Sequence, residues 1–118
     1  MSKDKPRDQP SFRLQIKHGV AIGPGKAELL ERIAERGSIS QAGKAMGMSY
    51  RTAWLLVDSM NEHFTAPLVV TSKGGANGGG AQLTPLGMDV LQRYRAMERR
   101  ALKAIARDIG ELGSLIKP

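Results

Sequence analysis

The stretch from residue 37 to residue 61, GSISQAGKAMGMSYRTAWLLVDSMN, constrains the fold of this 118-residue chain more than any other. Its first half predicts a short helix from Ile39 to about Met46. Ser38 is placed to cap this helix, and Gln41 completes the capping-box pattern three residues later. Gly47 suits the left-handed turn that follows, because a residue without a Cβ carries no steric penalty there.

The second half predicts another helix, which begins after Ser49 as its N-cap and runs to about Asn61. Two short helices joined by a tight turn form a helix-turn-helix, whose second helix presents its N-terminal side chains to the DNA major groove. The small residues Ala42, Gly43 and Ala45 would let another helix approach closely. An αα-hairpin in a small helical domain gives the same pattern, so this stretch alone leaves both interpretations open.

The charge of the chain favours a polyanionic partner. Lys and Arg number 18 against 11 Asp and Glu, a formal net charge of +7, which suits nucleic acid or an anionic membrane. The start, MSKDKPRDQP, is charged and contains proline, unlike a secretory signal. Since no apolar run is long enough to span a membrane, we expect a cytoplasmic protein without a membrane partner.

Catalytic and cofactor chemistry is disfavoured. With no cysteine, the chain has no disulfide, zinc ribbon or thiol nucleophile. His18 and His63 lack a spaced carboxylate pair with which to form a metal site or a triad. Gly75 and Gly80 have the spacing of a phosphate-binding loop, but Ala-Gln stands where Lys-Ser/Thr is required. We therefore expect no enzyme, no metal site and no cofactor.

A β-hairpin is predicted after the helix-turn-helix, where residues 68–71 and 81–84 form two short strands around a glycine-rich tip. In this position the hairpin would be the wing of a winged helix. A tip with few side chains can approach DNA, with Lys73 and the amides of Gly74 and Gly75 facing phosphates. A loop that makes no DNA contact is the alternative.

The flanking segments complete the predicted architecture. Phe12, Leu14 and Ile16 alternate with polar residues as in a half-buried strand, and residues 26–36 form an amphipathic helix ending at Gly37. The predicted fold is mainly α with a small β-hairpin. It comprises a disordered basic arm (1–10), a winged helix-turn-helix (11–84) and a dimerisation helix (85–118).

The final helix is expected to start at Thr84-Pro85 and to run to Ile109 or beyond. Its apolar residues recur with the three- and four-residue spacing of a helix pair, and a helix this long cannot bury such a seam against so small a domain. We therefore expect a homodimer. The arginines on the other side, including Arg93 and Arg95, predict a solvated cationic face. The predicted dimer contacts are Leu91, Tyr94, Leu102, Ile105 and Ile109.

The motifs SISQA, SYRTAW and GGANGGGAQLT, followed by PLG and a long helix, together resemble one known family. Between about Ile16 and Met97 the chain is similar to the N-terminal DNA-binding domain of ModE molybdate-responsive transcription regulators. Their helix-turn-helix also resembles that of LysR-type regulators. The resemblance implies a cytoplasmic homodimer bound to a two-fold-related, palindromic operator, with molybdenum-related genes as targets. Full-length members carry a C-terminal molybdate-binding domain.

Because the sequence given stops at Pro118, we do not expect these residues to bind molybdate. The chain is either a short natural member, which its charged start and its Lys-Pro end favour, or a fragment. It is predicted to be a sequence-specific DNA-binding transcription regulator. The alternative is a non-catalytic winged-helix interaction module that forms mixed dimers with a full-length regulator.

Arg51 is the best candidate for reading a base, because a guanidinium can donate two parallel hydrogen bonds to guanine. Trp54 either touches DNA or supports the wing. The first helix of the motif crosses the phosphates in this class of protein, so its polar residues are candidate backbone contacts. The predicted DNA-binding set is Ser38, Gln41, Lys44, Ser49, Tyr50, Arg51, Thr52 and Trp54, together with the wing residues Lys73, Gly74 and Gly75.

Overall fold

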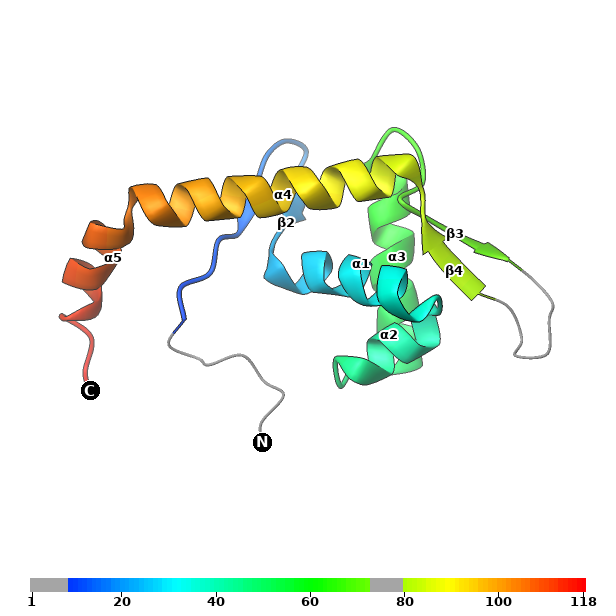
Figure 1. Cartoon of the computed structure of the whole chain (residues 1–118), viewed down its shortest axis with the longest axis horizontal. Coiled ribbons are helices and arrows are strands. Elements are labelled where there is room, and N and C mark those ends of the chain that lie inside the picture. Colours follow the sequence, from blue (N-terminus) through cyan, green and yellow to red (C-terminus); the bar gives the residue numbers. More distant parts are fainter. Residues whose placement is uncertain (1–8, 73–79) are drawn as a thin grey trace.

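The computed structural model describes residues 9–72 and 80–118, which form a mainly helical domain with a long arm (Figure 1). This confirms the predicted fold class. The predicted arm, apart from Gln9 and Pro10, and the wing-tip residues Lys73, Gly74 and Gly75 lie outside the described residues. The elements in chain order are β1 (Leu14–Gln15), β2 (Ala21–Ile22), α1 (Pro24–Arg36), α2 (Ile39–Ala45), α3 (Tyr50–His63), β3 (Val69–Ser72), β4 (Gly80–Leu83), α4 (Pro85–Ala104) and α5 (Ala106–Gly113).

The hydrophobic core lies where α1 packs against α2, β4 and α4. Leu29, Leu30 and Ile33 of α1 are fully buried, and Val57 and Met60 of α3 are nearly so. α1 ends at Gly37, whose φ of 68° is left-handed, as its sequence position predicts. Among the described elements, no helix is both long and apolar enough to cross a membrane.

The wing strands form an antiparallel hairpin of β3 and β4 that is tied to the end of α1. Its register pairs Val69 with Leu83 and Ser72 with Gly80. The Ala81 amide donates to the Gly37 carbonyl at 2.8 Å, which ties β4 to the end of α1. These contacts set the position of the wing strands relative to the helix-turn-helix.

Asn61 joins α3 to the wing with both ends of its side-chain amide. Its Oδ1 accepts from the Leu68 and Val69 amides at 2.8 and 3.1 Å, and its Nδ2 donates to the Val69 carbonyl at 3.0 Å. The sequence placed Asn61 only at the end of a helix. A side chain that satisfies three backbone groups of a neighbouring strand holds that strand in place.

The first predicted strand is shorter than its alternating pattern indicates. β1 contains only Leu14 and Gln15, and Ile16 is 67% exposed rather than half-buried. The reason is a turn at His18 and Gly19, which have φ values of 56° and 76°. Within it the Val20 amide donates to the Lys17 carbonyl, so the chain reverses before the alternation can continue.

The predicted long C-terminal helix is present as α4, but the structure differs from the prediction in two respects. The helix breaks at Ile105, which has φ −112° and ψ 18°, and α5 leaves the axis of α4 (Figure 1). Leu91 and Tyr94, both predicted dimer contacts, are only 7% and 2% exposed because the first half of α4 covers the core of its own protomer. Only the later seam residues remain accessible on the chain.

Arg95 does not belong to a solvated cationic face. Its guanidinium donates to both carboxylate oxygens of Glu31 at 3.0 and 2.8 Å and to Glu98 at 2.9 Å. Its side chain is 20% exposed, and these carboxylates raise its pKa. A bidentate, partly buried pair of this kind fixes α4 against α1.

Candidate nucleic-acid interface

The two helices of the motif are capped as the sequence predicts. Ser38 Oγ accepts from the Gln41 amide at 3.1 Å, and Ser49 Oγ accepts from the Thr52 amide at 3.0 Å. Gly47 has a φ of 73°, and its amide donates to the Lys44 carbonyl at 3.1 Å. The turn between the two helices is therefore stabilised by hydrogen bonds and a glycine torsion angle that involve only nearby residues.

Gly43 sets the separation of α2 and α3. A Cβ built on this residue would lie 2.8 Å from the Cβ of Ala53, closer than two carbon atoms can approach. Gly43 and Ala53 are both buried. The expectation that small residues allow close helix approach is correct here.

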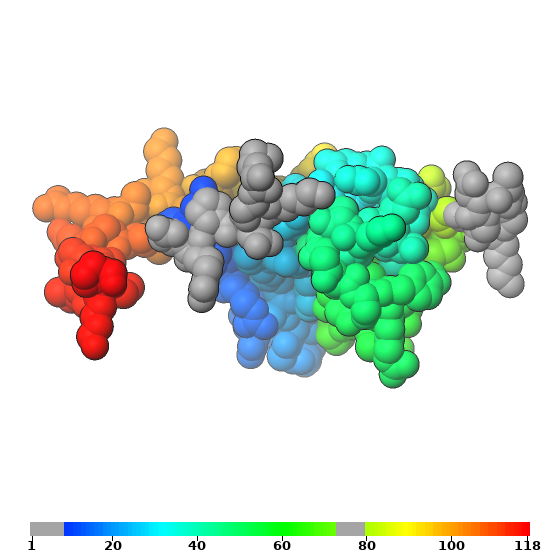
Figure 2. All heavy atoms as spheres, turned by 90° about the horizontal axis from the view of Figure 1, so that it is seen from below, coloured from blue at the N-terminus to red at the C-terminus, as the bar shows by residue number. Residues whose placement is uncertain are grey.

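The first turn of α3 points away from the core. Tyr50 is 60% exposed, and Arg51 and Thr52 are also exposed, whereas Ala53 is completely buried. Figure 2 shows α2 and α3 together on one face, with the strands of the wing to one side. A convex helix start beside a second helix has the shape that enters a major groove.

The hydroxyl groups of Ser38 and Ser49, at the starts of α2 and α3, already make hydrogen bonds within the domain. Ser49 Oγ donates to Thr52 Oγ1 at 2.9 Å in addition to its capping bond, and Ser38 caps α2. Gln41 and Lys44 are exposed on α2. The side chains most available to a ligand are therefore those of Gln41, Lys44, Tyr50 and Arg51.

Trp54 supports Tyr50. The two rings meet edge-on, with centroids 6.0 Å apart and an interplanar angle of 68°. Trp54 is half-buried and packs against the core, and its Nε1 is buried without a hydrogen-bond partner among the described residues. The Trp54 ring thus restricts where the exposed Tyr50 ring can lie.

Sequence reasoning missed two residues on the exposed face of α3. Leu55, one turn after Arg51, is 54% exposed and could meet a thymine methyl group. Asp58 is exposed farther along the same face, where its carboxylate would repel phosphate. The signal was present in the helical spacing, because both residues fall outside the apolar positions that pack inward. The carboxylate of Asp58 would therefore confine a nucleic-acid contact to the first two turns of α3.

Comparison with known proteins identifies the family. The profile of the "Bacterial regulatory helix-turn-helix protein, lysR family" matches residues 25–88, from the start of α1 into α4. The chain is 42% identical over 89 residues to the molybdenum transport protein ModE of Azotobacter vinelandii, covering 75% of the chain and 33% of that protein.

Two other relatives show the same extent of similarity. The molybdenum-pterin-binding protein MopB of Rhodobacter capsulatus is 40% identical over 88 residues, covering 75% of the chain and 33% of MopB. The DNA-binding transcriptional dual regulator ModE of Escherichia coli K12 is 37% identical over 91 residues, covering 77% and 35%. The chain spans about a third of the length of these relatives. It belongs to the lysR family of bacterial regulatory helix-turn-helix proteins, and the resemblance to ModE regulators is confirmed.

Proposed function

We propose that this protein is a transcription regulator that binds specific DNA sequences, as a homodimer, through α2 and the start of α3. Family membership supports the DNA-binding regulatory role. The observation that carries the proposal is the state of Arg51. Its side chain is exposed and makes no hydrogen bond or ion pair with any other described residue. Arg32, Arg93, Arg95 and Arg107 are each paired with a carboxylate, and of the described arginines that are exposed and unpaired, which include Arg36, Arg99 and Arg100, Arg51 is the one at the start of α3.

An unpaired guanidinium at this position suits a guanine edge. In the major groove guanine offers two acceptors, O6 and N7, to a bidentate donor, and each such pair discriminates against the wrong base by about 1–3 kcal/mol. Gln41 and Lys44 would contact the phosphates from α2. In this proposal the wing residues Lys73, Gly74 and Gly75 add further backbone contacts.

The operator is proposed to be two-fold symmetric and to lie among genes that handle molybdenum. Relatives that are 37–42% identical are named as ModE regulators or molybdenum transport proteins, which supports this choice of targets. A homodimer is supported by the apolar residues that remain accessible at the end of the arm. Ile105, Leu112 and Ile116 are 46%, 65% and 69% exposed, and Leu102 and Ile109 are half-buried. We therefore divide the chain into a DNA-binding region (11–84) and a dimerisation region (85–118).

Binding to DNA fragments selected from a genome tests the proposal. Fluorescence anisotropy would compare the wild-type protein with Arg51→Ala and with Arg93→Ala, which removes an exposed cation of α4 that is paired with Asp89. Arg51→Ala should lose about 1–3 kcal/mol of binding free energy and relax the preference at one base pair of each half-site. Arg93→Ala should bind with nearly wild-type affinity.

The pattern of loss separates the possible roles of Arg51. A loss that is equal on every sequence would assign Arg51 to a phosphate instead of a base. An unchanged affinity for Arg51→Ala on every sequence would refute the proposed interface.

A further inference from the structure

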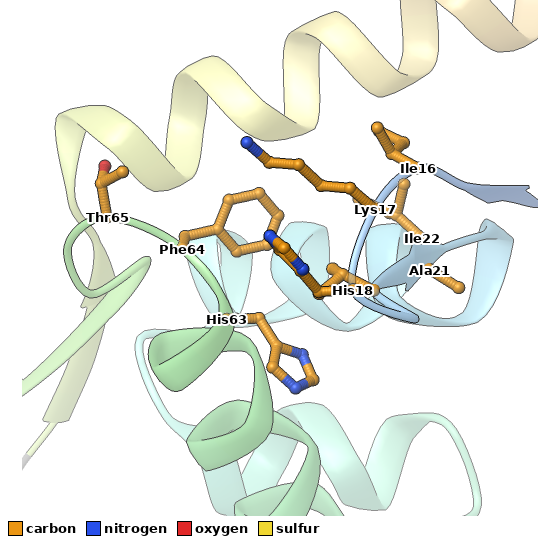
Figure 3. Close-up of a pocket in the computed structure, with 9 residues that line it drawn as sticks. Ile16, Lys17, His18, Ala21, Ile22, His63, Phe64 and Thr65 are labelled. Carbon is orange, nitrogen blue, oxygen red and sulfur yellow. The ribbon is translucent and has the colours of Figure 1, made fainter.

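An apolar pocket opens between the β1–β2 turn and the C-terminal end of α3 (Figure 3). Its volume is about 210 Å³, and Ile16, Val20, Ile22 and Phe64 provide apolar lining. Three of its described lining residues have side chains that can carry a positive charge, namely Lys17, His18 and His63, and no other described lining residue does. We call this the hairpin pocket. It therefore combines an apolar floor with a basic rim.

α5 is an apolar helix without an adequate partner in its own chain. Ile109 and Leu112 lie on one side of it, with Ile105 as its N-cap and Ile116 just after its end, and Leu112 and Ile116 are 65% and 69% exposed. Helices this short are marginal in water, and Gly110 weakens this one further. Among the described elements α5 makes substantial contact with α4 alone, and Figures 1 and 2 show it apart from the main body.

One of the two acidic residues of α5, Asp108, is placed at the edge of its apolar stripe, whereas the other, Glu111, is paired with Arg107. Asp108 lies three residues after Ile105 and one turn before Leu112, which puts it beside the stripe. Its carboxylate makes no hydrogen bond or ion pair within the described residues, and the same is true of the side-chain ammonium group of Lys17 at the pocket. In a chain of net charge +7, an acidic edge facing a basic rim offsets the repulsion between two copies.

We propose that, in the homodimer of the proposed function, α5 of each protomer seats its apolar stripe in the hairpin pocket of the other. Asp108 then faces the partner's Lys17. α4 starts near the C-terminal end of α3, and its 20 residues place α5 about 30 Å away from that start. The occupant of the pocket therefore comes from a second copy of the chain. Two-fold symmetry forms the same contact twice.

This seating has a consequence for DNA recognition. The pocket includes His63 and Phe64, at the end of the helix whose start carries Tyr50 and Arg51. A partner's α5 docked there fixes the separation of the two α3 helices. That separation determines the spacing of the two half-sites on the duplex.

Charge exchange between the two surfaces tests the seating. Dimer dissociation of the full chain would be measured by analytical ultracentrifugation for Lys17→Glu, Asp108→Lys and the double variant carrying both changes. Each single change places like charges opposite each other at two symmetric contacts and should raise the dissociation constant by about tenfold. The double variant should return it to within about threefold of the wild-type value. Lys103→Glu, an exposed charge reversal on α4, is the matched control and should have little effect.

An apolar substitution gives an independent readout. Leu112→Asp should abolish the dimer while leaving the circular dichroism of the rest of the domain intact, since Leu112 contributes nothing to the protomer core. A dimer unchanged by Leu112→Asp, Lys17→Glu and Asp108→Lys would overturn the seating and leave the proposed homodimer standing. Failure of the double variant to recover would also overturn it. A wild-type chain that stays monomeric would overturn both the seating and the homodimer.

Discussion

Gly43→Ala should weaken both the fold and DNA binding. The added methyl carbon would lie 2.8 Å from the Ala53 Cβ, whereas carbon atoms pack at about 3.5–4.0 Å. α2 and α3 must therefore separate by about 1 Å. Overpacking of this kind costs about 1–3 kcal/mol, and the higher helix propensity of alanine returns up to about 1 kcal/mol. We expect a net loss of about 1–2 kcal/mol in the free energy of unfolding.

Urea denaturation followed by circular dichroism measures this loss. Gly25→Ala in α1 is the matched control, because a Cβ there meets nothing within 4 Å. That control should be neutral or slightly stabilising. Gly43→Ala should also bind DNA less tightly under conditions where it is fully folded, since the displacement moves Gln41 and Lys44 relative to Arg51.

A double-mutant cycle with Ala53→Gly shows whether the clash is the cause. In Gly43→Ala/Ala53→Gly the methyl group moves from one helix to the other, which relieves the contact. The two changes should therefore be non-additive, with the double variant more stable than the sum of the single effects predicts by about 1–2 kcal/mol. Additive effects, or a Gly43→Ala variant as stable as Gly25→Ala, would refute the reasoning.

Three further changes test contacts that hold the domain together. Asn61→Ala should cost about 2–3 kcal/mol in urea denaturation, because it leaves three backbone groups of the wing unpaired. Arg95→Ala should cost about 3 kcal/mol, and Arg95→Ala/Glu31→Ala should cost less than the sum of the single losses. Burial and Glu98 raise the pKa of Tyr94 to about 12, above its ordinary value, so this residue's contribution to stability should be complete below pH 10 and lost between pH 10 and 12. The stability difference between wild type and Tyr94→Phe should therefore shrink over that interval, and a constant difference would contradict the shift.

Features that depend on neighbouring residues were predictable from the sequence. The caps Ser38, Ser49 and Thr84 and the left-handed Gly47 all appear in the structure, because each rests on a bond or a torsion angle within a few residues. The same holds for the inward face of α3. The exposure of Arg51 follows from its helical phase relative to Ala53.

Features that depend on distant parts of the chain were not predictable. The 3-4 spacing that includes Leu91 and Tyr94 is equally compatible with a dimer seam and with a protomer core, and the choice depends on where α4 crosses α1. Arg95 finds Glu31 across 64 positions of sequence. The helix breaks at Ile105, where the sequence has no proline or glycine. The apolar spacing is uninterrupted there and therefore predicted one continuous helix.

Site-directed DNA cleavage tests the central claim most directly. The chain contains no cysteine, so Leu55→Cys introduces a single thiol beside Arg51 to which an iron chelate can be attached. On a selected DNA fragment, we predict two clusters of strand cleavage in the major groove, one helical repeat or a small multiple apart. The same chelate on Arg93→Cys, on the outer side of α4, should give no such clusters. Cleavage from the Arg93 position with none from the Leu55 position would contradict the account.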